Sequence, residues 1–174
     1  MQAPNVFREV TQLSSEDCFV MVSRTKSEFT YPIHIHPEYE LNFIENAKGA
    51  QRVIGDSMEE IDDLELCLVG SENLSHAWMN HNCVSSEIHE ITIHFHKAIF
   101  LESLLNKRQF RSMSVMLENA KRGIVFSRPV IEKVKDKLNS LITKENGFHS
   151  VIDLLTIVCE LSIDENSRIL CTST

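Results

Sequence analysis

Histidine and glutamate gather in one short segment of this 174-residue chain. The run Tyr31-Pro-Ile-His-Ile-His-Pro-Glu-Tyr-Glu40 contains His34, His36 and Glu40. Residues two apart on a β-strand share a face, so His34 and His36 are expected to point the same way, and Glu40 has the same parity. Imidazoles and a carboxylate suit Zn, Ni, Fe or Mn. The spacing therefore predicts that these side chains can meet at one divalent transition metal.

A fourth ligand is expected from an adjacent strand. His76 follows the apolar segment 64–69 and is our candidate. Two alternatives stay open beside the metal site. The same four side chains could line a pocket without a metal, or they could lie on the surface.

Further side chains could contact a ligand. Tyr31 and Trp78 could stack on a ligand ring, although aromatic residues in a barrel more often belong to the core. His94 and His96 form a second H-x-H, which could add to the pocket if it faces inward, but we favour a solvated or rim position. Glu38 is expected to face solvent.

Short strands must position these residues. Pro32, Pro37, Gly49, Gly55 and Gly70 punctuate the first half of the chain. Between such turn residues lie short β-prone or alternating segments, which are typical of a sandwich or barrel. We expect strands at 18–23, 39–45, 50–54, 57–61, 64–69 and 86–96.

The second half has helical periodicity instead. Apolar residues at helical spacing predict helices over 98–106, 109–120, 129–143 and 150–163. Ser127 is a candidate N-cap with Pro129 in the first turn, while Gly123 and Gly147 are expected to end helices. The apolar arc of 150–163 is wider than one neighbour needs. It could pack on the barrel, form half of a homodimer interface, or do both.

Composition excludes several classes of protein. With 43% hydrophobic and 24% charged residues the chain is globular, and its net charge of −8 argues against a nucleic-acid-binding surface within it. It has no apolar run of about 18 residues and no visible signal peptide, so we expect neither a membrane span nor secretion. Five cysteines without a C-x-x-C pair are expected to be reduced thiols in a cytoplasmic protein.

The spacing H-x-H-x-x-x-E, with a later glycine and then His76 six residues after Gly70, resembles the cupin double motif. The match is partial. Gly49 comes nine residues after Glu40 rather than seven, and the proline of the second motif is missing. The resemblance implies that His34, His36, Glu40 and His76 occupy the metal positions of a small β-barrel.

A longer resemblance covers about residues 18–160. The segments His34-Ile-His-Pro-Glu-Tyr-Glu-Leu-Asn-Phe-Ile, Asn73-Leu-Ser-His-Ala-Trp78 and Leu117-Glu-Asn-Ala-Lys-Arg-Gly-Ile-Val-Phe-Ser127 look like the N-terminal effector domain of AraC-family transcription regulators. This implies a cupin-like double-stranded β-helix barrel followed by C-terminal α-helices. We expect a barrel with an N-terminal arm over 1–97, a helical dimerisation and linker region over 98–164, and a polar tail over 165–174.

The resemblance also implies a function. The chain would bind a small-molecule effector inside the barrel and form a homodimer, and it would not be an enzyme. DNA would be contacted only through a helix-turn-helix domain, which this sequence lacks, so we interpret the chain as part of a longer regulator. The alternative is a stand-alone metal-dependent cupin enzyme, a dioxygenase or isomerase.

Overall fold

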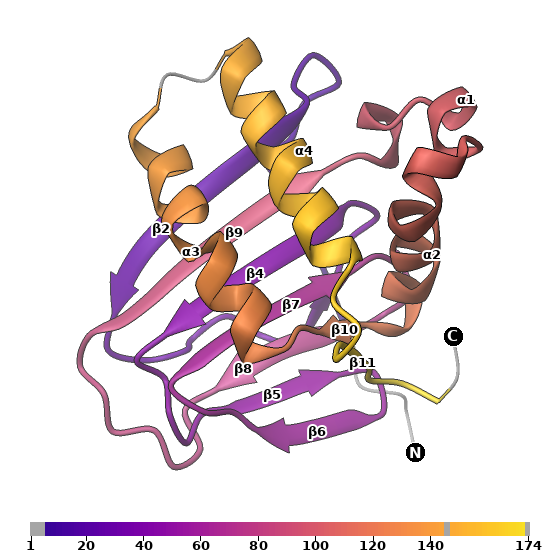
Figure 1. Cartoon of the computed structure of the whole chain (residues 1–174). Coiled ribbons are helices and arrows are strands. Elements are labelled where there is room, and N and C mark those ends of the chain that lie inside the picture. Colours follow the sequence, from indigo (N-terminus) through magenta and orange to yellow (C-terminus); the bar gives the residue numbers. More distant parts are fainter. Residues whose placement is uncertain (1–5, 145–146, 173–174) are drawn as a thin grey trace.

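Two β-sheets face each other and enclose the interior of the barrel (Figure 1). The computed structural model describes residues 6–144 and 147–172. One sheet has the order β1 (Phe7–Arg8), β3 (His34–Ile35), β8 (His76–Met79), β5 (Gln51–Ile54) and β6 (Ser57–Glu60). The other has the order β11 (Arg168–Ile169), β10 (Ile124–Val125), β7 (Leu64–Val69), β4 (Tyr39–Glu45), β9 (Ile88–Phe95) and β2 (Phe19–Lys26). Neighbouring strands are antiparallel, except that β1 and β3 are parallel.

The six-stranded sheet is covered on both faces, which explains the almost continuous burial of β4. Leu41 and Phe43 belong to the hydrophobic cluster that contains the helices, whereas Glu40 and Asn42 line the barrel interior. The same alternation holds along β9. Ile91 and every second residue after it pack under the helices, and the residues between them point into the barrel. The inward-facing residues of β9 include Glu90, Thr92 and His94.

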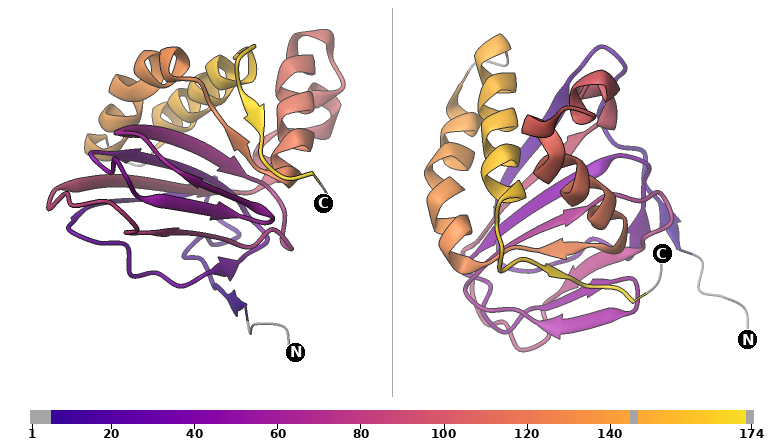
Figure 2. Two further views of the ribbon diagram at one scale, coloured as in Figure 1. Left: turned by 90° about the horizontal axis from the view of Figure 1, so that it is seen from below. Right: turned by 45° about the vertical axis from the view of Figure 1, so that its right-hand side comes forward.

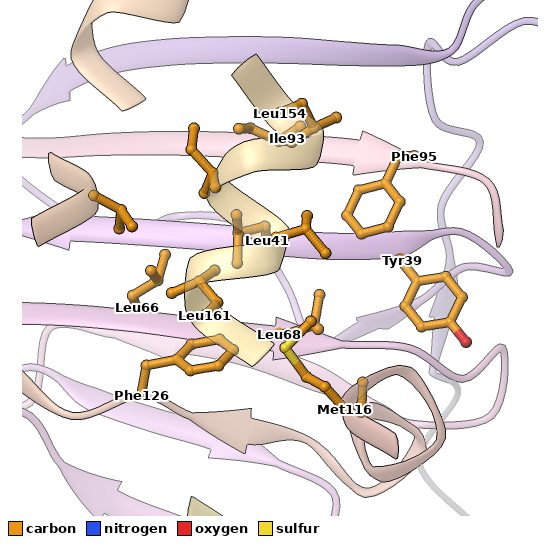
Figure 3. Packing of buried hydrophobic residues seen from close by; sticks show 14 of the residues in the cluster. Tyr39, Leu41, Leu66, Leu68, Ile93, Phe95, Met116, Phe126, Leu154 and Leu161 are labelled. Atoms are coloured by element: carbon orange, nitrogen blue, oxygen red, sulfur yellow. The ribbon is translucent and has the colours of Figure 1, made fainter. Parts of the chain in front are cut away.

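The helices lie on the outer face of the six-stranded sheet (Figure 2). They are α1 (Glu102–Leu105), α2 (Arg111–Asn119), α3 (Arg128–Thr143) and α4 (Phe148–Ser162), with 3-10 turns at Lys97–Ile99, Arg108–Phe110 and Ala120–Arg122. Figure 3 shows Leu154 and Leu161 of α4 packed in one cluster with Leu41, Leu68 and Phe126 of the sheet side. The helical region and the barrel thus share a hydrophobic core.

The helix expected over 98–106 was wrong in extent. The chain forms a 3-10 turn and then only the short α1, because Phe100 and Leu101 between them adopt extended backbone angles. Phe100 enters the core in that conformation, while Leu101 stays exposed. The apolar residues of this segment are therefore divided between a 3-10 turn and a short helix.

Of two residues predicted at helix ends, one is confirmed and one differs. Ser127 is the N-cap residue of α3, with Pro129 in the first turn as predicted, although its backbone N–H and its hydroxyl both donate to the Asp164 carboxylate, at 2.8 Å each, and its side chain makes no bond to the helix. Gly147 does not end the preceding helix; it is the N-cap of α4. The Asp164 contacts join the start of α3 to the end of α4.

The segment expected to be a polar tail, 165–174, contributes a strand. β11 pairs with β10, and Cys171 is buried, with its thiol donating to the carbonyl of Ile54 at 3.0 Å. Gly123, at φ 68°, lies against this segment. A Cβ added to Gly123 would approach the Ile54 side chain to 2.8 Å. The C-terminal residues through Thr172 therefore pack against the edge of the barrel.

The wide apolar arc of α4 is only partly used inside the chain. Its inner residues are buried against α2, α3 and the sheet, whereas Phe148 and Ile152 remain 75% and 42% exposed. Packing on the barrel is thus confirmed, and a dimer interface stays a prediction. Within the described residues, no helix combines the length and apolar character needed to cross a bilayer.

Candidate functional site

Strand register brings the predicted histidines and Glu40 together inside the barrel. His34 of β3 lies opposite His76 of β8, and Glu40 of β4 lies opposite His94 of β9. His36 lies in the short link between β3 and β4. All five side chains are buried, with His76 and Glu40 only 0% and 2% exposed.

One carboxylate oxygen is the centre of this cluster. The Nε2 atoms of His36 and His94 each lie 3.0 Å from Glu40 Oε2, and Nε2 of His76 lies 3.4 Å from the same atom. Asn42 donates from Nδ2 to the other oxygen, Oε1, at 3.1 Å. Glu40 is therefore held in place by residues from four parts of the barrel.

Backbone contacts fix where two of the ring protons are. Nδ1 of His34 lies 2.9 Å from the Pro32 carbonyl, and Nδ1 of His76 lies 2.9 Å from the Leu74 carbonyl. A carbonyl can only accept, so both Nδ1 atoms carry a proton, and in a neutral ring Nε2 is then a lone pair. The lone pair of His76 faces the Glu40 carboxylate, an arrangement that requires a proton or a metal cation between them.

Charge and burial act in opposite directions on these groups. Burial would raise the pKa of Glu40, but the charge of His76 and the imidazole hydrogen bonds hold it well below its usual value. Burial would lower the pKa of His76, but the charge and hydrogen bond of Glu40 raise it above 6.5. Burial and the neighbouring His76 lower the pKa of His34. The interior therefore favours an ionised carboxylate beside positive charge.

The donor set fits a divalent transition metal. One ligand atom from each of His34, His36, Glu40 and His76 can be chosen so that all four lie within 4.8 Å of one another. A second set, Glu9, His36, Glu40 and His94, meets the same criterion. Three imidazoles and one carboxylate are ligands that Zn, Ni, Fe and Mn accept, and the inward lone pair of His76 is the orientation that a ligand needs.

A cavity of about 320 Å³ opens beside the cluster. Its wall combines polar side chains, such as Asn42 and Thr92, with apolar ones, such as Val22 and Phe29. Glu9, Val10 and Gln12 line one side, so the N-terminal segment contributes to the wall. That segment is held by two backbone bonds, from Phe7 N–H to Ile33 at 3.3 Å and from Glu9 N–H to Ile35 at 2.9 Å.

Tyr31 and Trp78, the predicted aromatic contacts, both line this cavity. Tyr31 is partly exposed at its rim, and burial together with the Glu9 carboxylate raises the pKa of its phenol to about 12. Trp78 is buried, and its Nε1 donates to Glu65 at 3.1 Å. Trp78 therefore offers the cavity its ring rather than its hydrogen-bond donor.

Two residues differ from their expected orientation. His94, for which we favoured a solvated position, points into the cluster because the other face of β9 packs under the helices. His96 follows the end of β9 and does not line the cavity, which agrees with the favoured solvated or rim position, so we leave it out of the candidate site. Glu38, expected in solvent, is 8% exposed, and its position two residues from both His36 and Glu40 agrees with their inward parity.

A buried ion pair next to the site was not predicted from the sequence. Arg52 of β5 is 1% exposed and donates to Glu65 of β7 at 2.5 Å and to Glu59 of β6 at 2.5 Å. Glu65 also accepts the hydrogen bond from Trp78 Nε1. The Arg52–Glu65 ion pair thus connects the two sheets behind the cavity wall. An arginine and a glutamate in otherwise apolar strands were the available signal.

Comparisons with known proteins identify the fold. No protein-family model and no curated protein sequence matches the chain significantly. A 1.65 Å structure of ToxT from Vibrio cholerae matches 88% of this chain and 59% of its own, with a TM-score of 0.51 and 12% identity. Apo ToxT carrying a lysine-to-alanine substitution, from V. cholerae strain SCE256, matches 82% of this chain and 53% of its own, with a TM-score of 0.53 and 10% identity.

These similarities establish a shared fold. They confirm the predicted fold class, a cupin-like barrel of two sheets followed by C-terminal helices. This chain spans somewhat more than half the length of the ToxT chains that it matches.

Proposed function

We propose that this chain is the ligand-sensing and dimerisation domain of an AraC-type transcription regulator. The sequence resemblance over about residues 18–160 supports this assignment, as does the fold shared with ToxT, itself an AraC-family regulator. The observation that carries the proposal is the cavity of about 320 Å³ between the sheets, with polar groups converging at one end. Such a cavity suits a small-molecule effector.

The effector is bound next to a divalent transition metal, Zn, Ni, Fe or Mn. His34, His36, Glu40 and His76 are its ligands, and Tyr31, Trp78 and His94 are effector contacts. When bound, the metal supplies a Lewis acid that can hold an oxygen or nitrogen atom of the effector. Asn42 keeps the Glu40 carboxylate oriented through the Oε1 contact.

The role is binding rather than catalysis. Effector binding changes the relative stability of two arrangements of the dimer, which is how a sensor domain transmits a signal. The N-terminal segment, which lines the cavity through Glu9, Val10 and Gln12, is one part that an effector would contact directly. DNA is contacted by a helix-turn-helix domain of the longer cytoplasmic protein.

Mass spectrometry of retained small molecules tests the effector proposal. The chain is purified under native conditions, and compounds released by denaturation are compared for wild type and Thr92→Phe. Thr92 lines the cavity, so a phenyl ring there takes up binding volume. We expect a compound released stoichiometrically by wild type and strongly depleted in Thr92→Phe.

The matched control is Thr25→Phe, which adds the same ring to β2 at an exposed position outside the cavity lining. It should retain the compound at the wild-type level. Circular dichroism checks that both variants are folded. Equal recovery from wild type and folded Thr92→Phe, or no retained compound at all, would contradict an effector in this cavity.

A further inference from the structure

Glu38 and His36 each have a buried polar atom without a hydrogen bond among the described residues. These atoms are Oε2 of Glu38 and Nδ1 of His36. They lie 3.6 Å apart, and the two side chains are 10% and 0% exposed. A buried carboxylate oxygen without a partner is costly, so this juxtaposition requires an explanation.

The proton on His36 decides whether the two atoms attract or repel. A neutral imidazole carries one proton, and His36 Nε2 lies 3.0 Å from Glu40 Oε2. Without a cation, the proton sits on Nε2 and is donated to Glu40. Nδ1 is then a lone pair that faces the lone pairs of Glu38, which accounts for the missing hydrogen bond.

A metal at Nε2 reverses this arrangement. The metal takes the Nε2 lone pair, so the ring proton must be on Nδ1, where it points at the Glu38 carboxylate. Both unpartnered atoms are then satisfied by one hydrogen bond. Because N–H···O bonds are about 2.7–3.2 Å long, the carboxylate must move by about 0.5 Å, which side-chain rotation of Glu38 allows.

We propose that Glu38 is the positioning residue that holds His36 in its metal-binding tautomer. This inference rests on the metal site of the proposed function. Carboxylates that accept the second N–H of a ligating histidine orient the ring and increase its basicity. Glu38 would act only through His36, without touching the metal or the effector.

Cobalt titration tests this role, since Co²⁺ occupies zinc sites and absorbs visible light. The whole chain is stripped with a chelator, and Co²⁺ affinity and absorption spectrum are measured for wild type and Glu38→Gln. We expect Glu38→Gln to bind Co²⁺ about 10- to 100-fold more weakly. The exposed Glu87→Gln is the matched control and should bind like wild type.

Thermal unfolding of the metal-free proteins separates positioning from general structural damage. Without metal, Glu38 is a buried carboxylate facing a lone pair, so Glu38→Gln should unfold at the same temperature as wild type or higher. A purely structural role would lower both the unfolding temperature and the affinity. Weaker Co²⁺ binding together with unchanged or increased metal-free stability supports the proposal.

Three results would overturn the proposal in distinguishable ways. Equal Co²⁺ affinity in wild type and Glu38→Gln would show that Glu38 does not position His36, while the metal site itself would stand. Absence of Co²⁺ binding by folded wild type would show that there is no metal site, and hence no positioning role for Glu38. Joint loss of affinity and metal-free stability assigns Glu38 a structural role instead.

Discussion

Glu40 is the residue on which the polar interior of the barrel depends. Three imidazoles from different elements point at its Oε2 atom, and Asn42 orients its other oxygen. Replacing Glu40 by glutamine keeps the shape of the side chain but removes the charge that the histidines surround. The variant therefore isolates the electrostatic part of the cluster.

The stability provided by Glu40 should depend on pH. Its folded pKa is depressed, so its contribution is present above the ordinary value of 4.5 and is lost as the pH falls through the folded pKa. The folded pKa of His76 is raised, so the stability that His76 contributes is complete below its ordinary pKa of 6.5 and is lost as the pH rises through the folded pKa.

In chelator-treated protein, the unfolding free energy of wild type minus that of Glu40→Gln should therefore be largest between about pH 4.5 and about pH 6.5. Denaturant unfolding across the acid to alkaline range measures this difference. A difference that does not vary with pH would show that the charges of Glu40 and His76 are not coupled in the folded state.

Sequence spacing alone was sufficient to predict that four residues of the cluster meet. The period of two placed His34, His36 and Glu40 on one face, and the following strand supplied His76. His94 was misjudged because its orientation depends on which face of β9 the helices cover. Glu38 was misjudged although it shares the even parity of His36 and Glu40. The orientation of His94 depends on tertiary structure, whereas the local pattern already contained the signal for Glu38.

At the scale of elements, the ion pair of Arg52 and Glu65 joins β5 to β7 and hence one sheet to the other. Both side chains are buried. Removing one partner leaves an uncompensated buried charge, and Arg52→Met should therefore lower the unfolding free energy by about 3–5 kcal/mol. Denaturant unfolding measures the loss.

The control is Arg128→Met, which removes an exposed arginine paired with Asp63 and Glu132. It should lower the unfolding free energy far less than Arg52→Met does, since exposed ion pairs contribute little. The double variant Arg52→Met/Glu65→Leu should recover part of the loss. Equal costs for the two arginine variants would mean that the Arg52 pair is screened by solvent.

Strands and long helices were predictable at this scale, while short connecting elements were not. The apolar spacing of α3 continues over four turns, so its identity does not depend on context. The segment 98–106 has similar spacing over a shorter length, and burial of Phe100 in an extended conformation outweighs helix formation there. β11 has only two residues and forms through pairing with β10.

At the scale of the whole molecule, the exposed apolar residues of α4 are the candidate surface for dimer formation. Phe148 and Ile152 lie one turn apart, and both are exposed although α4 packs on the barrel. If this face forms the proposed dimer interface, wild type should have twice the chain mass by light scattering, and Ile152→Glu should be monomeric. Charge repulsion and desolvation of the carboxylates would oppose burial of that face.

Val115→Glu is the control, because Val115 is exposed on α2, a different helix. It should remain dimeric. A wild-type monomer at high micromolar concentration would exclude the α4 interface, and a dimer that survives Ile152→Glu would place the interface elsewhere.

The central claim is that the buried histidines and Glu40 form a metal site inside a ligand-binding barrel. Calorimetric titration of chelator-stripped protein with Zn²⁺ tests it most directly. We predict that wild type binds a single ion per chain and that folded Glu40→Gln and His76→Ala lose this binding, because each lacks one ligand. Folded wild type that binds no Zn²⁺, or variants that bind it equally well, would contradict the account.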